Sequence, residues 1–104
     1  MVHKVLIDEQ ALGWIKDNQS KVEEDYEIIY KVGTEPAPKQ GSGDKTIGRF
    51  CEEKCCNLIT GDYTAYLDIL ENSRIHAIQI EKYSADKAER RMYLRHCSVL
   101  GRFT

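Results

Sequence analysis

Three acidic residues stand at points where an apolar run ends or a helical pattern begins. Asp8 follows the run VLI, Asp62 follows the stretch NLITG, and Asp44 opens a helical pattern after a loop rich in proline, glycine and serine. Three ionised carboxylates lying within a few ångströms of one another repel, and protonation or a bound cation relieves this repulsion. Hard oxygen ligands favour Mg²⁺ or Mn²⁺, which keep several waters and accept phosphate oxygens. The three acids therefore predict a metal site suited to phosphodiester hydrolysis, where the ion orients and acidifies the attacking water.

Helix capping is the competing interpretation of each acid. Aspartate is a preferred N-cap residue, and a carboxylate also suits the positive end of the helix dipole. Asp8, Asp44 and Asp62 each stand at or near a predicted helix start. Taken alone, each is better explained as a cap, and only the coincidence of all three favours the metal site.

Alternating strands and helices must position these acids. We predict four strands, over residues 3–7, 26–32, 57–60 and 76–80, and four helices, around the apolar residues of 11–15, 47–55 and 66–70 and from the N-cap Ser84 to about residue 96. This alternation predicts an α/β fold with three α/β/α layers and a four-stranded, mainly parallel sheet. In the strand order 2-1-3-4 the first and third strands are neighbours, and the crevice at their carboxyl ends would bring Asp8 and Asp62 together.

Length and composition allow one domain and exclude several classes of protein. With 104 residues, 41% of them hydrophobic and 31% charged, we expect residues 1–104 to form a single domain with one core. The formal net charge of −2 gives no overall basic field, so a nucleic acid would have to bind a local patch. The apolar runs fall far short of the ~20 residues that cross a bilayer, and the first residues lack the apolar core of a signal peptide. We therefore expect a cytoplasmic protein with no membrane contact.

The four cysteines are expected to remain thiols, because the chain shows no export signal. Cys51 and Cys55 continue the apolar stripe that Ile47 and Phe50 begin on the second predicted helix. This placement predicts small apolar core residues rather than metal ligands.

Two segments combine motifs that occur together in one family. Residues 5–12 read VLIDEQAL, a strand that ends in "IDE", and residues 41–62 read GSGDKTIGRFCEEKCCNLITGD, a helix that opens with Asp and a strand that ends in "T-x-D". In this order they resemble a PIN-like domain, and more narrowly its short variant, over about the first three quarters of the chain. The resemblance implies a metal-dependent, single-strand-directed ribonuclease fold, which is often the toxin half of a toxin–antitoxin pair.

The resemblance also assigns residues. It implies that Asp8, Asp44 and Asp62 are catalytic acids that bind Mg²⁺ or Mn²⁺, and it makes Glu9, the second acid of "DE", the next catalytic candidate. Relatives usually carry another Asp two residues beyond the third of these acids, whereas this chain has Thr64 there, so one ligand is missing or has moved. Two functions stay open: an endoribonuclease acting on single-stranded RNA, and a catalytically impaired PIN-like module that binds RNA or protein. The expected partners are RNA, an antitoxin protein and, because relatives often pair through helices, a second copy of the chain.

Basic and hydroxyl side chains near the predicted crevice are the candidates for substrate binding. Lys45 and Arg49 stand at i and i+4 of the second helix and suit phosphate groups best. The hydroxyls of Thr60 and Thr64 could bond a water, a carboxylate or the substrate, although Thr60 also suits a strand for its β-propensity alone. The basic residues near the C-terminus are more simply explained as the solvated face of the last helix, whose Ala88 and Met92 would face the core.

Overall fold

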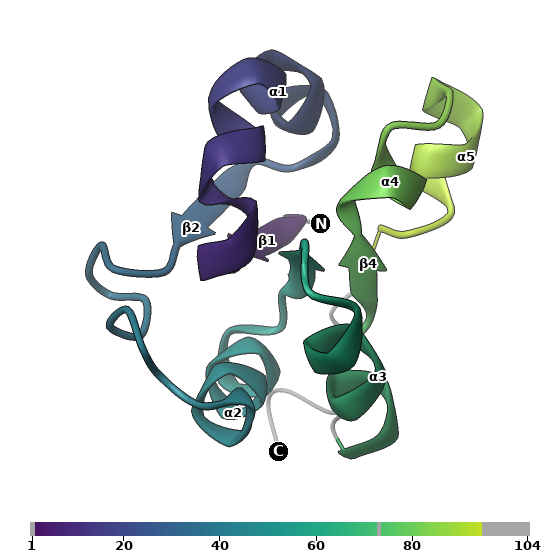
Figure 1. The fold of residues 1–104 in the computed structure, drawn as a ribbon. Coiled ribbons are helices and arrows are strands. Elements are labelled where there is room, and N and C mark those ends of the chain that lie inside the picture. Colours follow the sequence, from purple (N-terminus) through teal and green to yellow (C-terminus); the bar gives the residue numbers. More distant parts are fainter. Residues whose placement is uncertain (1, 73, 95–104) are drawn as a thin grey trace.

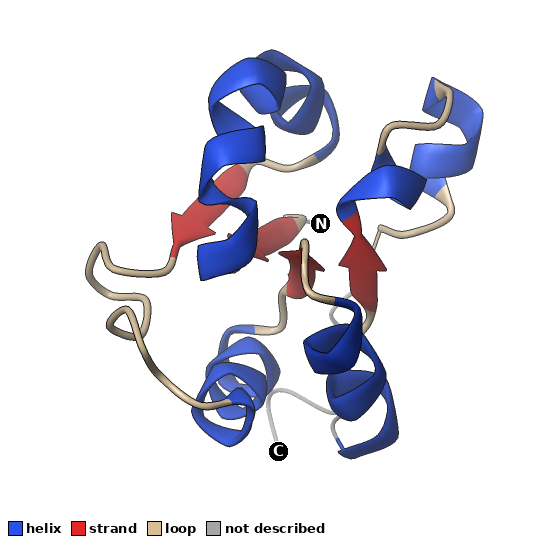
Figure 2. Cartoon of the chain, viewed as in Figure 1, coloured by secondary structure: helices blue, strands red, loops and turns tan. Residues whose placement is uncertain are grey.

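A computed structural model describes residues 2–72 and 74–94 of the chain, and Figures 1 and 2 show its arrangement. Four parallel strands form one sheet in the order β2-β1-β3-β4: β1 (Lys4–Ile7), β2 (Ile28–Lys31), β3 (Asn57–Thr60) and β4 (Ala77–Gln79). The helices are η1 (Glu9–Ala11), α1 (Leu12–Asp25), α2 (Asp44–Lys54), α3 (Tyr63–Asn72), α4 (Ile80–Tyr83) and α5 (Lys87–Arg91). The predicted α/β class, parallel sheet and strand order are confirmed.

Alternate strand residues build the two faces of the sheet. Leu6 and Leu58 face the side on which α2 and α3 pack, and they share a core with Ile47 and Ile69 of those helices. The side chains that alternate with them along the strands, such as Ile7, point to the opposite face and pack with α1 and α4 in a second core. The period of two along each strand therefore separates two apolar layers, one on each side of the sheet.

The register of β1 and β3 brings their carboxyl ends to one edge. Ile7 lies opposite Ile59, and the backbone N–H of Asp8 donates to the carbonyl oxygen of Ile59 at 2.8 Å. Figure 1 shows α2 and α3 side by side on one face of the sheet, and α3 begins directly after the carboxyl end of β3. Asp8 and Asp62 therefore follow two neighbouring strands at the same edge, and the charges of both act on Asp44 at the start of α2.

The first helix is longer than its apolar residues predicted. The polar stretch after Ile15 continues α1 as far as Asp25, because Val22 and Asp25 are buried and keep one face of the helix on the sheet. The helix ends where the Tyr26 backbone becomes extended, with its N–H still bonded to the Val22 carbonyl. None of the helices within the described ranges is long and apolar enough to span a membrane.

The cysteines only partly follow the prediction. Cys51 and Cys56 are buried free thiols, in keeping with small core residues. Cys55 is buried as well, but it is disulfide-bonded, so the expectation that every cysteine remains a thiol is wrong at this position.

The C-terminal helices depart from the prediction in two ways. Asp86, not Ser84, caps α5, because the Asp86 carboxylate accepts the backbone N–H of Glu89 at 3.1 Å. Ser84 instead ends α4, and residues 95 and 96 of the predicted helix lie outside the described residues. The predicted core face is also wrong: Met92 is 78% exposed, whereas Arg90 is only 6% exposed.

A buried carboxylate explains why Arg90 faces the interior. Its Nε donates to Oδ2 of Asp25 at 3.0 Å, and the Tyr83 hydroxyl donates to the same oxygen at 2.7 Å. Trp14 packs edge-on against Tyr83, with the ring centres 5.6 Å apart. Burial, together with the Asp25 carboxylate, raises the pKa of the Tyr83 hydroxyl above its ordinary value. This Asp25–Tyr83–Arg90 cluster holds α4 and α5 against the end of α1.

Candidate functional site

Thr60 connects two of the three predicted acids. Its hydroxyl donates to Oδ2 of Asp8 at 2.7 Å and accepts the backbone N–H of Asp62 at 3.1 Å. Because the Thr60 side chain is fully buried, it fixes these neighbours and does not itself reach the surface. The predicted bond between the Thr60 hydroxyl and a neighbouring carboxylate is confirmed, whereas a direct contact of this hydroxyl with substrate does not fit its burial.

Two of the acids also act as helix caps. Oδ1 of Asp8 accepts the Glu9 N–H at 2.8 Å at the start of η1, and Oδ1 of Asp62 accepts the Thr64 N–H at 2.9 Å and the Ala65 N–H at 3.3 Å. A carboxylate oxygen has two lone pairs, so capping does not use up either side chain. Within the described residues, Oδ2 of Asp62 accepts no hydrogen bond. The capping interpretation therefore holds for Asp8 and Asp62 without removing them from the site.

The turn between β3 and α3 packs directly on η1. A Cβ atom at Gly61 would lie 2.9 Å from the backbone carbonyl oxygen of Gln10, which is closer than side-chain carbons approach oxygen. Glycine is thus required where the turn after Thr60 passes the segment that follows Asp8. This close approach keeps the Asp62 turn beside the Asp8 turn.

Asp44 is the one predicted acid that does not cap a helix. It is the first residue of α2, and the N-cap position belongs to Gly43, which has no side chain to bond. Desolvation raises the pKa of Asp44, and a hydrogen bond and charge repulsion from Asp68 raise it further, followed by the charges of Asp8 and Asp62. Three other carboxylates therefore act on Asp44 at this edge of the sheet.

A cavity between α2 and α3 adjoins this group of acids. Its volume is about 390 Å³, and its lining residues are Asp44, Lys45, Arg49, Glu52, Asp68, Ile69 and Asn72. The Asn72 amide donates to Oδ1 of Asp68 at 2.6 Å and so orients that carboxylate within the cavity wall. The predicted phosphate contacts Lys45 and Arg49 line the same cavity and are exposed.

Glu9 and Thr64 have other surroundings. The exposed Glu9 carboxylate accepts the backbone N–H of Gly41 at 2.7 Å, which ties the loop before α2 to η1. The Thr64 side chain is exposed, and its backbone N–H bonds to Asp62. Glu9 therefore positions the loop, while Thr64 presents an exposed hydroxyl side chain at the start of α3.

Asp68 is the acid that the sequence prediction missed. The prediction expected a further acid two residues after Asp62, where Thr64 stands, while Asp68 lies one and a half helical turns along α3. The helical period could have identified it, because Asp68 follows the buried Ala65 by three residues and precedes the buried Ile69. This spacing puts Asp68 at the border of the buried face, next to α2.

The acids lie near one another, but the described residues do not form a complete metal-binding site. Among residues 2–72 and 74–94, no group of three or more histidine, cysteine, aspartate and glutamate side chains is arranged to hold one metal ion. Mg²⁺ in proteins commonly keeps several waters and uses only one or two carboxylates. The Asp44–Asp68 pair, with both side chains on the wall of one cavity, fits a largely hydrated ion of this kind.

Comparison of the chain with models of protein families, with curated proteins and with solved structures found no match. The resemblance to PIN-like domains consequently stays a prediction from the motifs.

The raised pKa of Asp44 predicts how the metal-free protein responds to pH. A raised folded-state pKa means that Asp44 contributes stability fully below its unfolded pKa of about 3.9, and this contribution is lost as pH rises through the folded pKa. At pH 7 we therefore expect Asp44→Asn to raise the melting temperature in the presence of a chelator. The difference should shrink below pH 4 and at high salt, since much of the repulsion is screened by solvent.

Thermal unfolding of both proteins across pH 3–8 checks this expectation. Asp17→Asn, at an exposed position on α1, makes the same charge change away from the site and serves as the control. Adding Mn²⁺ should raise the melting temperature of the wild type more than that of Asp44→Asn. Equal pH profiles for Asp44→Asn and the control would contradict the repulsion.

Proposed function

We propose that this protein is a Mg²⁺- or Mn²⁺-dependent endoribonuclease that cuts single-stranded RNA. The observation that carries the proposal is the pKa of Asp44, which is raised first by desolvation, then by the hydrogen bond and charge of Asp68 on α3, and last by the charges of Asp8 and Asp62 at the ends of β1 and β3. Repelling carboxylates beside a cavity are costly for a protein unless a cation or a proton neutralises them. The cavity also carries exposed cations, which suit the phosphates of a substrate.

Asp44 and Asp68 would hold the ion directly, and Asp8 and Asp62 would bind its waters. When bound, the ion lowers the pKa of a coordinated water and neutralises charge that develops on the phosphodiester. The chain's own groups supply the rest of the arrangement. Thr60 keeps the Asp8 carboxylate facing the Asp62 turn, and Asn72 keeps Asp68 in its orientation.

Lys45 and Arg49 would bind the substrate phosphates next to the acids. They stand one turn apart on α2 and line the same cavity as Asp44, and neither forms an ion pair within the described part of the chain. A cation beside the reacting phosphate holds the substrate against the acids, which alone would repel it. Glu9 would act from a distance by holding the loop before α2.

A second candidate function is a PIN-like module that binds RNA or protein without cutting. It is favoured by the lack of a preformed group of three metal ligands in residues 2–72 and 74–94. In this case the basic residues of α2 would still bind a polyanion, but the acids would serve as caps and as a surface for a basic partner.

The cellular role follows from the motifs alone and is part of the proposal. A ribonuclease of this size would act in the cytoplasm as the toxin of a toxin–antitoxin pair, with an antitoxin protein and a second copy of the chain as partners. Single-stranded RNA is the substrate that the PIN-like resemblance implies.

The decisive experiment is cleavage of labelled single-stranded RNA by the purified protein. With Mn²⁺ we expect internal cuts, and with a chelator the same RNA should stay intact. Fully paired RNA of the same sequence serves as the substrate control. RNA that binds but stays intact in both Mn²⁺ and Mg²⁺ would reject the nuclease and leave the binding module.

A further inference from the structure

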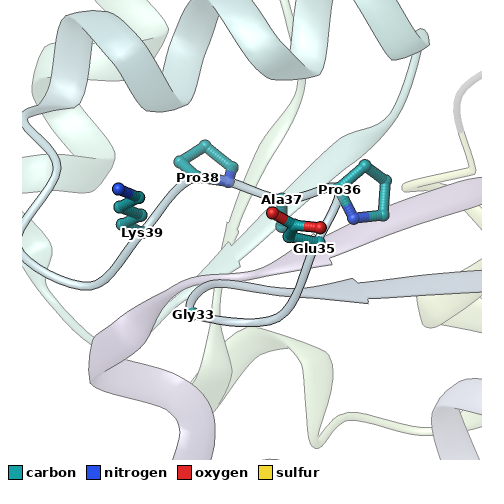
Figure 3. Close-up of a pocket in the computed structure, with 6 residues that line it drawn as sticks. All are labelled: Gly33, Glu35, Pro36, Ala37, Pro38 and Lys39. Carbon is teal, nitrogen blue, oxygen red and sulfur yellow. The ribbon is translucent and has the colours of Figure 1, made fainter.

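Three hollows follow one another from the loop after β2 to the acids. The first has a volume of about 660 Å³ and is open to solvent, and its lining residues all belong to the loop: Gly33, Glu35, Pro36, Ala37, Pro38 and Lys39 (Figure 3). The second, of about 380 Å³, lies between this loop and α2. The third is the acid-lined cavity of about 390 Å³ between α2 and α3.

A cationic side chain stands at each junction between these hollows. Lys39 lines both the first and the second hollow, and Arg49 lines both the second and the third. Both side chains are exposed, and within the described residues neither forms an ion pair. Two free positive charges therefore mark a path that ends at Asp44 and Asp68.

The second hollow offers contacts that suit a nucleotide chain. Thr46 contributes a hydroxyl, Ser42 contributes a hydroxyl oxygen that can still accept a hydrogen bond, and the half-buried Phe50 contributes an aromatic surface. The Phe50 ring is fixed by its edge-on contact with Tyr30, the ring centres being 5.1 Å apart. Glu53 is the one acid among its lining residues. Hydroxyls, cations and an aromatic ring together are the usual contacts of single-stranded nucleic acids.

The loop that carries Lys39 is held in place by its own hydrogen bonds. The Lys39 carbonyl accepts the Ser42 hydroxyl at 2.7 Å and the Ser42 N–H at 3.2 Å, and the Gly33 N–H donates to the Pro38 carbonyl at 2.8 Å. The Glu9 carboxylate binds the Gly41 N–H at the far end of the loop. The bonds at Lys39 use its backbone carbonyl, and its exposed ammonium group forms no ion pair within the described residues.

We propose that these hollows form a track for the phosphate backbone of single-stranded RNA, with Lys39 and Arg49 binding separate phosphates on the way to the acids. The inference rests on the proposed function for the class of substrate, but the binding it describes requires no cleavage. It adds Lys39, Ser42, Thr46 and Phe50 to the substrate-binding surface. It also predicts that long strands bind better than dinucleotides.

The test measures the binding of a labelled single-stranded RNA oligomer in a chelator at a series of salt concentrations. Each phosphate neutralised on a single strand contributes about 0.7 to the slope of log affinity against log salt. We expect Lys39→Gln to weaken binding and to reduce this slope by about 0.7. Lys82→Gln, on the exposed surface of α4, removes the same charge elsewhere and should leave the slope unchanged.

Three results would overturn the track: equal slopes for wild type and Lys39→Gln, equal losses in both variants, or binding of an acidic peptide but not of RNA. Cleavage separates this inference from the nuclease proposal. With Mn²⁺, Lys39→Gln should raise KM for long RNA, whereas Lys82→Gln should leave the cleavage of long RNA unchanged. A wild type that never cuts RNA but binds it through Lys39 would reject the nuclease and keep the track. If the wild type cuts RNA and Lys39→Gln cuts RNA of every length equally well, the track is rejected and the nuclease proposal is kept.

Discussion

Asp68→Asn is expected to reduce Mn²⁺-dependent cleavage of single-stranded RNA by at least about 100-fold, which corresponds to about 3 kcal/mol of transition-state stabilisation. The reason is that Asp68 is the side chain that interacts most closely with Asp44 and lies on the wall of the same cavity. Asparagine keeps the size and the contact with Asn72 but removes the negative charge that would hold the ion. The loss should appear in kcat at saturating RNA, since the exposed cations that bind substrate are unchanged.

Glu71→Gln is the matched control for Asp68→Asn. Glu71 is exposed on the same helix and is not among the residues that line the cavity. It should retain cleavage within a factor of about two, as expected for a distant surface charge. If Asp68→Asn cuts RNA as fast as Glu71→Gln, Asp68 is not a ligand, and the acid that the motif lacks has not moved to α3.

Arg90→Met is expected to have the largest effect on folding, lowering the free energy of unfolding by about 3–5 kcal/mol. Methionine can fill much of the space, but it leaves the Asp25 carboxylate buried with only the Tyr83 hydroxyl as a donor within the described residues. Among the described residues, the second oxygen of Asp25 has no hydrogen-bond partner, so no other contact would offset the loss of the arginine. Urea denaturation followed by circular dichroism measures the loss.

Lys87→Met provides the matched control on the same helix. Lys87 pairs with Glu24 at 3.3 Å, but these side chains are 55% and 50% exposed. An exposed pair contributes only about 0–1 kcal/mol, because water screens the charges. If Arg90→Met and Lys87→Met lower the free energy of unfolding by similar amounts, the buried ion pair of Arg90 stabilises the fold no more than an exposed pair, and the role assigned to Arg90 is wrong.

Much of the fold follows from local sequence patterns. Short β-branched runs that alternate with helical stripes such as Ile47 and Cys51 are sufficient to predict a parallel sheet, because each pattern is formed by neighbouring residues. The predicted strand order is also correct, although no local pattern determines it. The full length of α1 was not predictable in this way. Its second half is polar apart from Val22, and the burial of Asp25 depends on α5, which comes from the other end of the chain.

The candidate site, too, could be predicted only in part from the sequence. The positions of Asp8 and Asp62 at one edge follow from the strand pattern, and Thr60 is close enough in sequence for its contact to be foreseen. The helical period places Asp68 at the border of the buried face of α3, but its proximity to Asp44 could not be predicted, because it depends on how α2 packs beside α3. Likewise, the position of Lys39 depends on loop hydrogen bonds that have no periodic signal in the sequence.

The link between Asp25 and Arg90 also bears on folding kinetics. It joins residues 65 positions apart, so it can form only after most of the chain has been arranged. We expect this contact to be largely absent from the folding transition state, so that its loss would mainly increase the unfolding rate. The pair should therefore slow unfolding and lengthen the lifetime of the native state, while the refolding rate stays nearly unchanged.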